Sequence, residues 1–175
     1  MPYALFNAGR KPQREDNMKW LGPLTNEILH FYELTSVPTG DKTRNEAKGF
    51  SICTGIGGYK DDVATQNGFQ WINHNINDSA CFKMLGVQRV KLVVASEFDL
   101  TGLLKKASVS PNLVQKLYFP LHHIQGYIAF TNNIPDRVIQ QWRSVLDQLK
   151  APGRYDELVR EYLHSESKKV KQTNL

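Results

Sequence analysis

A four-residue apolar run, Leu92-Val93-Val94-Ala95, constrains the fold of this chain more than any other stretch of its sequence. Segments with helical spacing flank it, "NDSACFKMLGVQ" before it and "EFDLTGLLKKA" after it. A strand without alternating polar residues is typical of a parallel sheet that helices cover on both faces. Since further strand and helix patterns alternate along the chain, we predict an α/β fold with a parallel or mixed sheet.

A glycine-rich turn, "TGIGGYKDD" at residues 54–62, is the second strong feature. It follows the apolar segment "GFSIC" and precedes a helical pattern at residues 58–67. Backbone N–H groups that glycines leave free at a helix N-terminus favour an anion. A dinucleotide fingerprint would need glycine in place of Lys60, and the Gly-Lys-Ser/Thr of a phosphate loop is missing. The turn is therefore expected to suit a carboxylate as well as a phosphate.

Catalytic motifs are not apparent in the sequence. The pairs Ser96-Glu97 and His122-His123 are the best candidates for a nucleophile or a base. Neither a GxSxG elbow nor an HExxH motif surrounds them. We therefore expect a protein that is not an enzyme.

The cysteines and the acidic pairs give no sign of a metal. Cys53 lies in a predicted strand and Cys81 on the apolar face of a predicted helix, without CxxC or Cys/His spacing. We expect two separate core thiols rather than a disulfide. Asp61-Asp62 falls in a first helical turn, where the helix dipole favours acids. The sequence thus predicts neither metal nor cofactor.

The charge of the chain is modestly basic. Its formal net charge is +5, and the last eleven residues, "SESKKVKQTNL", carry three lysines against one glutamate. Elsewhere basic and acidic residues are interleaved, as is typical of a solvated surface, so we expect no nucleic-acid partner. No run approaches the roughly 20 apolar residues of a membrane span, and the N-terminus lacks an apolar core behind a basic start. As written, the chain is expected to be cytoplasmic.

Four stretches, in order over residues 4–163, together carry a resemblance to one family. "RKPQREDNMKWLGPL" contains an Arg-Glu pair followed by an aromatic residue and Gly-Pro, and "GFSICTGIGGYKDDVATQNGF" combines a strand, a glycine turn and a helix. "CFKMLGVQRVKLVVA" and the closing "GYIAFTNNIPDRVIQQWRSVLDQLKAPGRYDELVREYL" follow. This series resembles the family 3 extracellular solute-binding proteins, the amino-acid-type receptors of bacterial ABC importers.

The resemblance implies a periplasmic-binding-protein-like (type II) fold of two α/β lobes joined by two hinge strands, with an incomplete first lobe. Residues 1–35 would form the partial first lobe and first hinge strand, and residues 36–123 the second lobe. Residues 124–164 would return to the first lobe as a strand and helices, and residues 165–175 would be a basic tail. The helices should pack beside "YALFNAG", and the exposed apolar surface of the incomplete lobe would favour self-association.

The resemblance also implies a binding site. Arg14 would hold a ligand carboxylate through two parallel hydrogen bonds, for which a planar guanidinium is suited. The alternative for Arg14 is a surface salt bridge with Glu15 or Asp16. Further ligand contacts would come from Asn7, Gly9, Gly55, Ile56 and Gly57.

Lys91 is the main departure from the family pattern. It aligns with the aspartate that receptors of α-amino acids use for the ammonium group. A cation there would repel an ammonium, so we expect a dicarboxylate or other anionic solute rather than a typical amino acid.

The expected function is therefore non-enzymatic binding of a small polar or anionic solute, amino-acid-like or carboxylate, for delivery to an ABC permease of the inner membrane. The resemblance implies a periplasmic location, and the missing N-terminal part would impair binding. The alternative is a small α/β nucleotide- or phosphate-binding enzyme that uses the Gly55–Gly58 turn.

Overall fold

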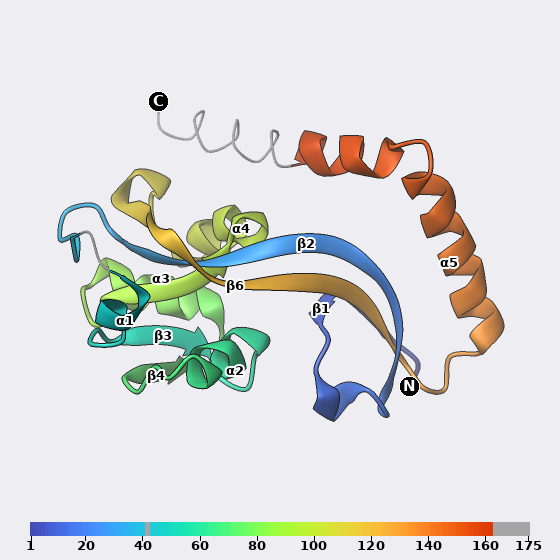
Figure 1. Ribbon diagram of the computed structural model, residues 1–175, viewed down its shortest axis with the longest axis horizontal. Helices are drawn as coiled ribbons and strands as arrows, with labels where there is room; N and C mark the ends of the chain where they lie inside the picture. The colour runs from blue at the N-terminus through green and yellow to red at the C-terminus, as the bar shows by residue number, and fades with distance from the viewer. Residues whose placement is uncertain (41–42, 163–175) are drawn as a thin grey trace. The chain divides into compact units, whose positions relative to one another are not determined.

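The computed structural model describes residues 1–40 and 43–162 of the chain (Figure 1). The chain divides into two compact units. We call Met1–Glu27 with Ile124–Leu175 the first unit and Ile28–His123 the second unit. Two long strands, β2 (Met18–Leu34) and β6 (Val114–Thr131), contribute residues to both units. The strands form one mixed sheet of six in the order β1-β6-β2-β5-β3-β4.

The second unit contains the parallel part of the sheet. Its strands are β3 (Ile52–Gly55), β4 (Ile72–Asn75) and β5 (Leu92–Ser96). β3 pairs in parallel with both β4 and β5, and β5 pairs antiparallel with β2. All five residues of β5 are buried. The prediction of an α/β fold around this fully buried strand is confirmed.

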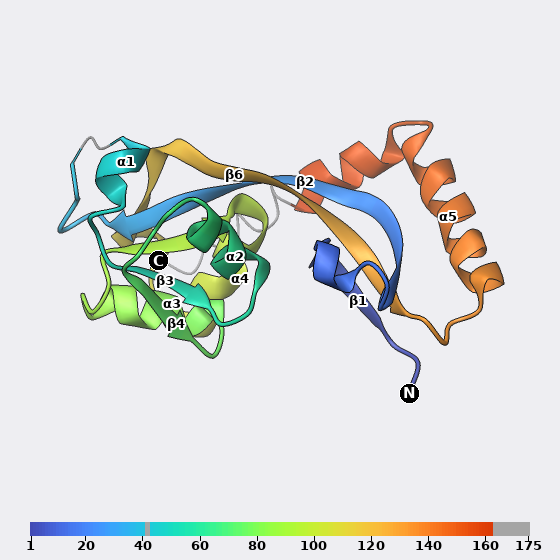
Figure 2. The ribbon, with the colours of Figure 1, turned by 60° about the horizontal axis from the view of Figure 1, so that its bottom comes forward.

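Helices follow each of the three parallel strands. They are α2 (Tyr59–Gln66), α3 (Asp78–Gly86) and α4 (Glu97–Ala107), and the shorter α1 (Arg44–Ala47) precedes β3. α3 packs against α4, as Figure 2 shows, and α2 against β3 and β4. Asn77 caps α3 by accepting a hydrogen bond from the N–H of Ala80 at 2.9 Å. The core between these layers includes Tyr32, Phe82, Leu85, Val93 and Leu104.

A disulfide joins Cys53 of β3 to Cys81 of α3, so the expectation of two separate thiols is wrong. Both residues are fully buried, and their Cα atoms are 5.4 Å apart. The separation of 28 residues along the chain does not predict that the two cysteines are close in space. It arises because α3 packs on β3, which brings the two predicted core positions face to face.

Two long strands run through prolines. β2 begins at Met18 and continues through Gly22-Pro23. The single strand β6 includes Pro120. Gly22 has a φ of 144°, which L side chains rarely adopt, and so the extended chain continues past Pro23.

The first unit is built on β1 (Ala4–Gly9), which pairs antiparallel with β6. Helix α5 (Asp136–Lys150) contributes Ile139 and Leu146 to its core, and residues 154–162 are also helical. The ring of Trp142 lies 6.0 Å from that of Phe6 and 5.9 Å from that of Phe130. The prediction that the C-terminal helix packs beside "YALFNAG" is confirmed. Short 3-10 helices span Pro12–Arg14 and Pro111–Leu113.

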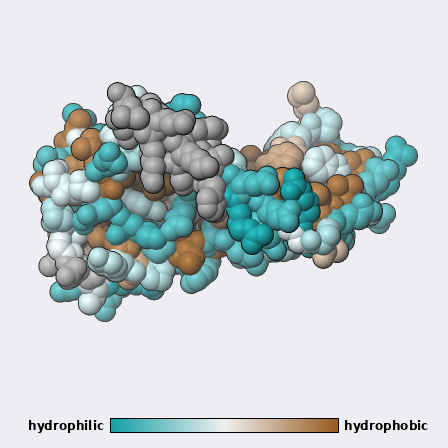
Figure 3. Space-filling model, turned by 90° about the horizontal axis from the view of Figure 1, so that it is seen from above, coloured by the Kyte–Doolittle hydropathy of each residue, from teal (hydrophilic) through white to brown (hydrophobic). Residues whose placement is uncertain are grey.

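Apolar side chains are exposed on β1 and α5. Phe6 is 56% exposed and Val145 is 56% exposed, with Trp142 at 44%. Figure 3 shows hydrophobic residues among hydrophilic ones on the surface of the unit that holds α5. Within residues 1–40 and 43–162, no helix combines the length and the apolar character needed to cross a membrane.

Candidate functional site

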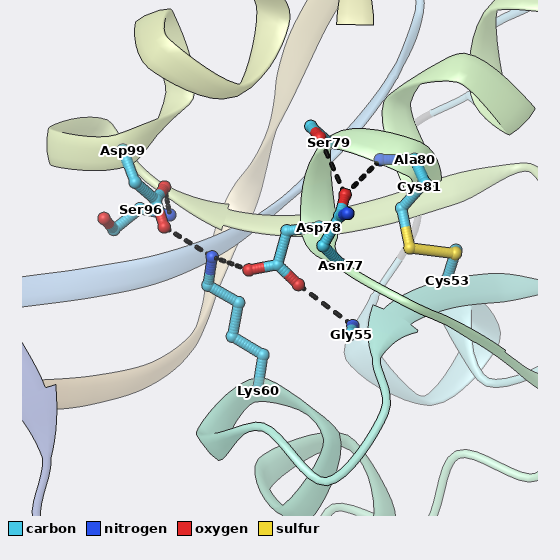
Figure 4. A network of polar contacts seen from close by, with 10 residues as sticks. All are labelled: Cys53, Gly55, Lys60, Asn77, Asp78, Ser79, Ala80, Cys81, Ser96 and Asp99. Carbon is cyan, nitrogen blue, oxygen red and sulfur yellow. Dashed lines mark hydrogen bonds and ion pairs between the residues drawn. A yellow bond between two sulfur atoms is a disulfide. The ribbon is translucent and has the colours of Figure 1, made fainter. Parts of the chain in front are cut away.

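The carboxyl ends of β3, β4 and β5 meet at one edge of the parallel sheet, where open α/β sheets bind ligands. Polar side chains there form a connected network, drawn in Figure 4. The network joins the glycine turn after β3 to the first turns of α3 and α4. Each helix begins directly after its strand, so the charged residues of these first turns come together in space.

The backbone N–H groups of the glycine turn are already bonded to the protein. Gly55 N donates to Asp78 Oδ1 at 2.9 Å, and Gly57 N donates to Asp61 Oδ2 at 3.1 Å. Ile56 N and Gly58 N donate to the carbonyls of Asn75 and Gly55. The anions that this turn holds are therefore carboxylates of the chain itself.

Lys60 lies at the centre of the network. Its ammonium Nζ is 2.7 Å from Asp78 Oδ2 and also bonds Asp99 Oδ2. The Lys60 side chain is only 12% exposed. Burial of the ammonium alone would lower the pKa of Lys60, but the Asp99 and Asp78 carboxylates outweigh it and raise the pKa. Burial raises the pKa of Asp99, and Lys60 opposes that rise.

Asp61 completes the network on the other side of the turn. Its Oδ1 accepts a hydrogen bond from Thr54 Oγ1 at 3.1 Å, and His74 Nδ1 lies 3.1 Å from the same oxygen. Thr54 is 1% exposed, whereas the His74 side chain is 46% exposed. Asp61 therefore ties the turn to the ends of both β3 and β4.

The structure does not bring Lys91 to the glycine turn. Lys91 precedes β5, and its backbone N–H donates to Ser51 O, at the amino ends of β5 and β3. The turn follows the carboxyl end of β3, about 13 Å further along, at roughly 3.3 Å per residue. The cation beside the turn is Lys60. Sequence reasoning had treated Lys60 only as a missing glycine.

The structure brings Arg14 and Gly9 together in the first unit. Arg14 Nη1 lies 3.4 Å from Gly9 O, a long hydrogen bond. Glu15 pairs with Arg10 through bonds of 2.7 and 2.6 Å, so it is not the partner of Arg14. Within the described residues, no carboxylate forms an ion pair with Arg14. Its half-buried guanidinium therefore retains N–H donors for an acceptor outside the protein.

Asn7 lies at an irregular point of β1. Its φ is 54°, and the register with β6 shifts between Leu5 and Ala8. The Asn7 amide donates to Glu27 Oε1 at 2.8 Å and accepts from Thr25 Oγ1 at 2.7 Å. Glu27 is only 5% exposed. Hydrogen bonds to two residues of β2 therefore hold the Asn7 side chain in place.

Substitution of Gly126 by alanine is expected to lower the free energy of unfolding by about 1–3 kcal/mol, as overpacking typically does. A Cβ at Gly126 would lie 1.6 Å from Asn7 Oδ1 and 2.4 Å from Thr25 Oγ1. Asn7 would have to leave its bonds to Thr25 and Glu27. Urea unfolding measures the change. Gly102→Ala is the control: no atom lies within 4 Å of the new Cβ in α4, so alanine should be neutral or stabilising.

A pocket of about 630 Å³ lies elsewhere in the second unit, lined in part by Glu33, Gln115 and Tyr118. Glu33 is 2% exposed. Its two carboxylate oxygens accept from Thr39 N and Gln115 Nε2, both at 2.7 Å. Because these donors satisfy Glu33, we place no functional site in this pocket.

Comparison with known proteins supports the fold. No family model matches the chain, and no curated protein matches it. Among solved structures, the P235GK mutant of ArgBP from T. maritima matches with a TM-score of 0.74 at 17% identity, over 90% of this chain and 67% of that chain. A putative ABC transporter binding component from Wolinella succinogenes DSM 1740, complexed with lysine, matches with a TM-score of 0.74 at 14% identity, with the same coverage.

A third match is the ancestral amino acid-binding protein AncCDT-1, a precursor of cyclohexadienyl dehydratase. Its TM-score is 0.72 at 15% identity, over 90% of this chain and 66% of that chain. The chain thus spans about two thirds of the length of these structures. At such identities the likeness shows the fold alone. This chain has a periplasmic-binding-protein-like α/β fold with a six-stranded sheet, and about a third of the matched ArgBP chain has no counterpart in it.

Proposed function

We propose that this protein binds a small solute that carries a carboxylate, without transforming it, and presents the solute to an ABC importer. The observation that carries the proposal is the environment of the Arg14 side chain. Its guanidinium is half-buried, lies against Gly9 O and has no carboxylate partner among the described residues. The shared fold with binding components of amino acid ABC transporters supports the same function.

Arg14 supplies the charge for the carboxylate, because a guanidinium can donate two parallel hydrogen bonds to it. Gly9 O on β1 lies against Arg14, and Asn7, two residues earlier on β1, is a further polar candidate for the site. In the second unit, Gly55, Ile56 and Gly57 of the glycine turn are further candidates for contact with a solute. Since their N–H groups are bonded within the protein, their contribution is shape and the side chain of Ile56, which is 69% exposed.

The partner in transport is a permease of the inner membrane, and the location is the periplasm. The buried Cys53–Cys81 disulfide supports this location, because disulfides persist in oxidising compartments. The exposed apolar residues of β1 and α5 further support self-association, which light scattering over a range of concentrations measures.

An enzyme that binds a nucleotide or phosphate at Gly55–Gly58 is the less favoured alternative. The N–H groups of the turn and the Lys60 ammonium are occupied by protein acceptors. In the part of the chain that the structure describes, no group of three metal-ligating side chains is found. AncCDT-1 is nevertheless a precursor of a dehydratase, so turnover of bound carboxylates is worth assaying alongside binding.

Arg14→Ala is expected to weaken solute binding by more than about tenfold, which corresponds to roughly 1.4 kcal/mol. Thermal shifts with amino acids, hydroxy acids, dicarboxylates and nucleotides identify a solute, and calorimetry then gives its affinity. Arg14→Lys should recover part of the affinity, because an ammonium offers no planar fork.

Arg10→Ala is the matched control for Arg14→Ala. Arg10 is close in sequence, but its guanidinium already pairs with Glu15 and lies over the Trp20 ring at 5.7 Å. Its removal should leave affinity within about threefold, less than 0.7 kcal/mol. If Arg14→Ala binds the solute as tightly as the unaltered protein does, the proposed function loses its main support.

A further inference from the structure

We propose that β1 is the surface through which this protein pairs with a second copy of itself, by antiparallel pairing of the two β1 strands at their open edges. This pairing rests on the self-association that the proposed function includes, and it gives that association a defined surface and a defined partner. It involves only the first unit, where β1 lies beside β6 and carries exposed apolar side chains.

One edge of β1 has no neighbouring strand. In the sheet order β1-β6-β2-β5-β3-β4, β1 is the outermost strand, and within the described part of the chain it pairs only with β6 (Figure 2). Tyr3 directs its backbone toward β6, because Thr131 N donates to Tyr3 O at 3.1 Å. Successive residues of a strand in an antiparallel pair direct their backbone groups to alternate sides. The N–H and C=O groups of Ala4 and Phe6 therefore point to the open edge.

The open edge is complementary to a second copy of itself. When two β1 strands lie antiparallel about a twofold axis at Leu5, Ala4 of one copy faces Phe6 of the other. Each of these residues offers one N–H and one C=O, so the two copies exchange about four hydrogen bonds. The same patch serves both copies, as twofold symmetry requires. The two Leu5 residues then form a pair without hydrogen bonds, in which the Cα atoms are about 4.5 Å apart.

The side chains of β1 carry no charge that would prevent this pairing. Natural edge strands are commonly protected by charged residues, especially lysine, or by proline. Residues 3–9, "YALFNAG", contain neither, although the chain as a whole has a formal net charge of +5. Two copies therefore approach at β1 without like charges on the paired residues. The register shift between Leu5 and Ala8 confines the pairing to the residues before it.

The same segment supplies an apolar interface. Tyr3, Leu5 and Phe6 are 55%, 50% and 56% exposed. A fully buried aromatic side chain covers roughly 150–250 Å², so pairing removes roughly 300 Å² of side-chain surface from each copy. Together with the strand backbone, the total approaches about 1,000 Å², the lower limit for a specific interface. We therefore expect a reversible, concentration-dependent dimer.

Leu5→Cys tests the geometry of the pair. The two cysteines of the chain form the buried Cys53–Cys81 disulfide, so the new thiol is the only free one. Cα atoms about 4.5 Å apart are within the range of a disulfide. Because pairing raises the effective concentration of the two thiols, mild oxidation should give at least about tenfold more covalent dimer than in Val87→Cys. Val87, the control, is 66% exposed at the end of α3, away from β1.

Ala4→Pro tests the hydrogen bonds. Proline removes the N–H that points to the open edge, and an edge strand tolerates it because the ladder with β6 does not use that group. Light scattering on the full chain from about 1 μM to 1 mM should show a dimer whose dissociation constant rises at least about tenfold in Ala4→Pro. Leu5→Lys serves if Ala4→Pro does not fold, because it places two like charges directly opposite each other.

A monomer across this range, with no more crosslinking in Leu5→Cys than in Val87→Cys, overturns the inference. A dimer that Ala4→Pro and Leu5→Lys leave intact also overturns it, because the contact then lies elsewhere on the protein. Calorimetry with amino acids, hydroxy acids and dicarboxylates separates this pairing from the solute-binding function. A monomer that binds one of them refutes the pairing alone, and a dimer that binds none refutes the solute-binding function alone.

Discussion

Replacing Cys53 and Cys81 together by alanine is expected to lower the free energy of unfolding by about 3–4 kcal/mol. The disulfide closes a loop of 28 residues, and its loss restores the conformational freedom of that loop in the unfolded chain. Both residues are fully buried between β3 and α3, so neither side chain is in contact with solvent. Urea unfolding of the oxidised protein and the double variant measures the difference.

Chemical reduction of the disulfide provides the control. Dithiothreitol should destabilise the unaltered protein toward the level of the double variant and leave the double variant itself unchanged. Equal stability of the oxidised protein and the double variant, to within about 1 kcal/mol, would contradict the expectation.

The disulfide also bears on the polar network. Cys53 is two residues before Gly55, and Cys81 is three residues after Asp78, whose carboxylate bonds the Gly55 N–H. The covalent bond thus fixes β3 to α3 next to the hydrogen bond that orders the glycine turn. In an oxidising compartment, the turn would be held in place independently of any solute.

Local patterns in the sequence predicted the elements that carry most of the second unit. The apolar run of β5 indicated a strand buried on both faces, and the helical spacing of the segments on either side of it indicated α3 and α4. These signals are reliable because each depends on residues close in sequence. The α/β fold followed from their alternation.

Contacts between distant residues could not be predicted in the same way. The resemblance indicated Lys91 as the cation of the binding site, and the structure places Lys91 at the amino end of β5. In a parallel sheet, residues are neighbours when they stand at the same end of their strands, whatever their spacing along the chain. Lys60, Asp78 and Asp99 share the carboxyl end, and only the register of the strands reveals it.

The glycine turn shows the same limit. Its sequence correctly indicated backbone donors that suit an anion, and the structure supplies that anion from Asp78 and Asp61. Asp61 had an adequate local explanation as an acid in a first helical turn. The separation of Gly55 and Asp78 along the chain does not reveal that the Asp78 carboxylate accepts a hydrogen bond from the Gly55 N–H.

Asp78→Ala is accordingly expected to lower the free energy of unfolding by about 2–4 kcal/mol. The substitution removes the acceptor of the Gly55 N–H and one of the two carboxylates that bond the Lys60 ammonium. Lys60 is 12% exposed, so its ammonium cannot exchange the lost carboxylate fully for water. Asp99 remains as its partner, which keeps the expected loss below that of a completely unpaired buried charge.

Two variants separate the contributions to this loss. Asp78→Asn keeps an oxygen that can accept from the Gly55 N–H but removes the charge, so it should fall between the unaltered protein and Asp78→Ala. Asp136→Ala is the matched control, because Asp136 also lies in a first helical turn and pairs with a lysine, Lys19. Its side chain is 77% exposed, and such surface pairs contribute less than about 1 kcal/mol. If Asp78→Ala costs no more than Asp136→Ala in urea unfolding, the Asp78 carboxylate is not the internal anion that orders the glycine turn.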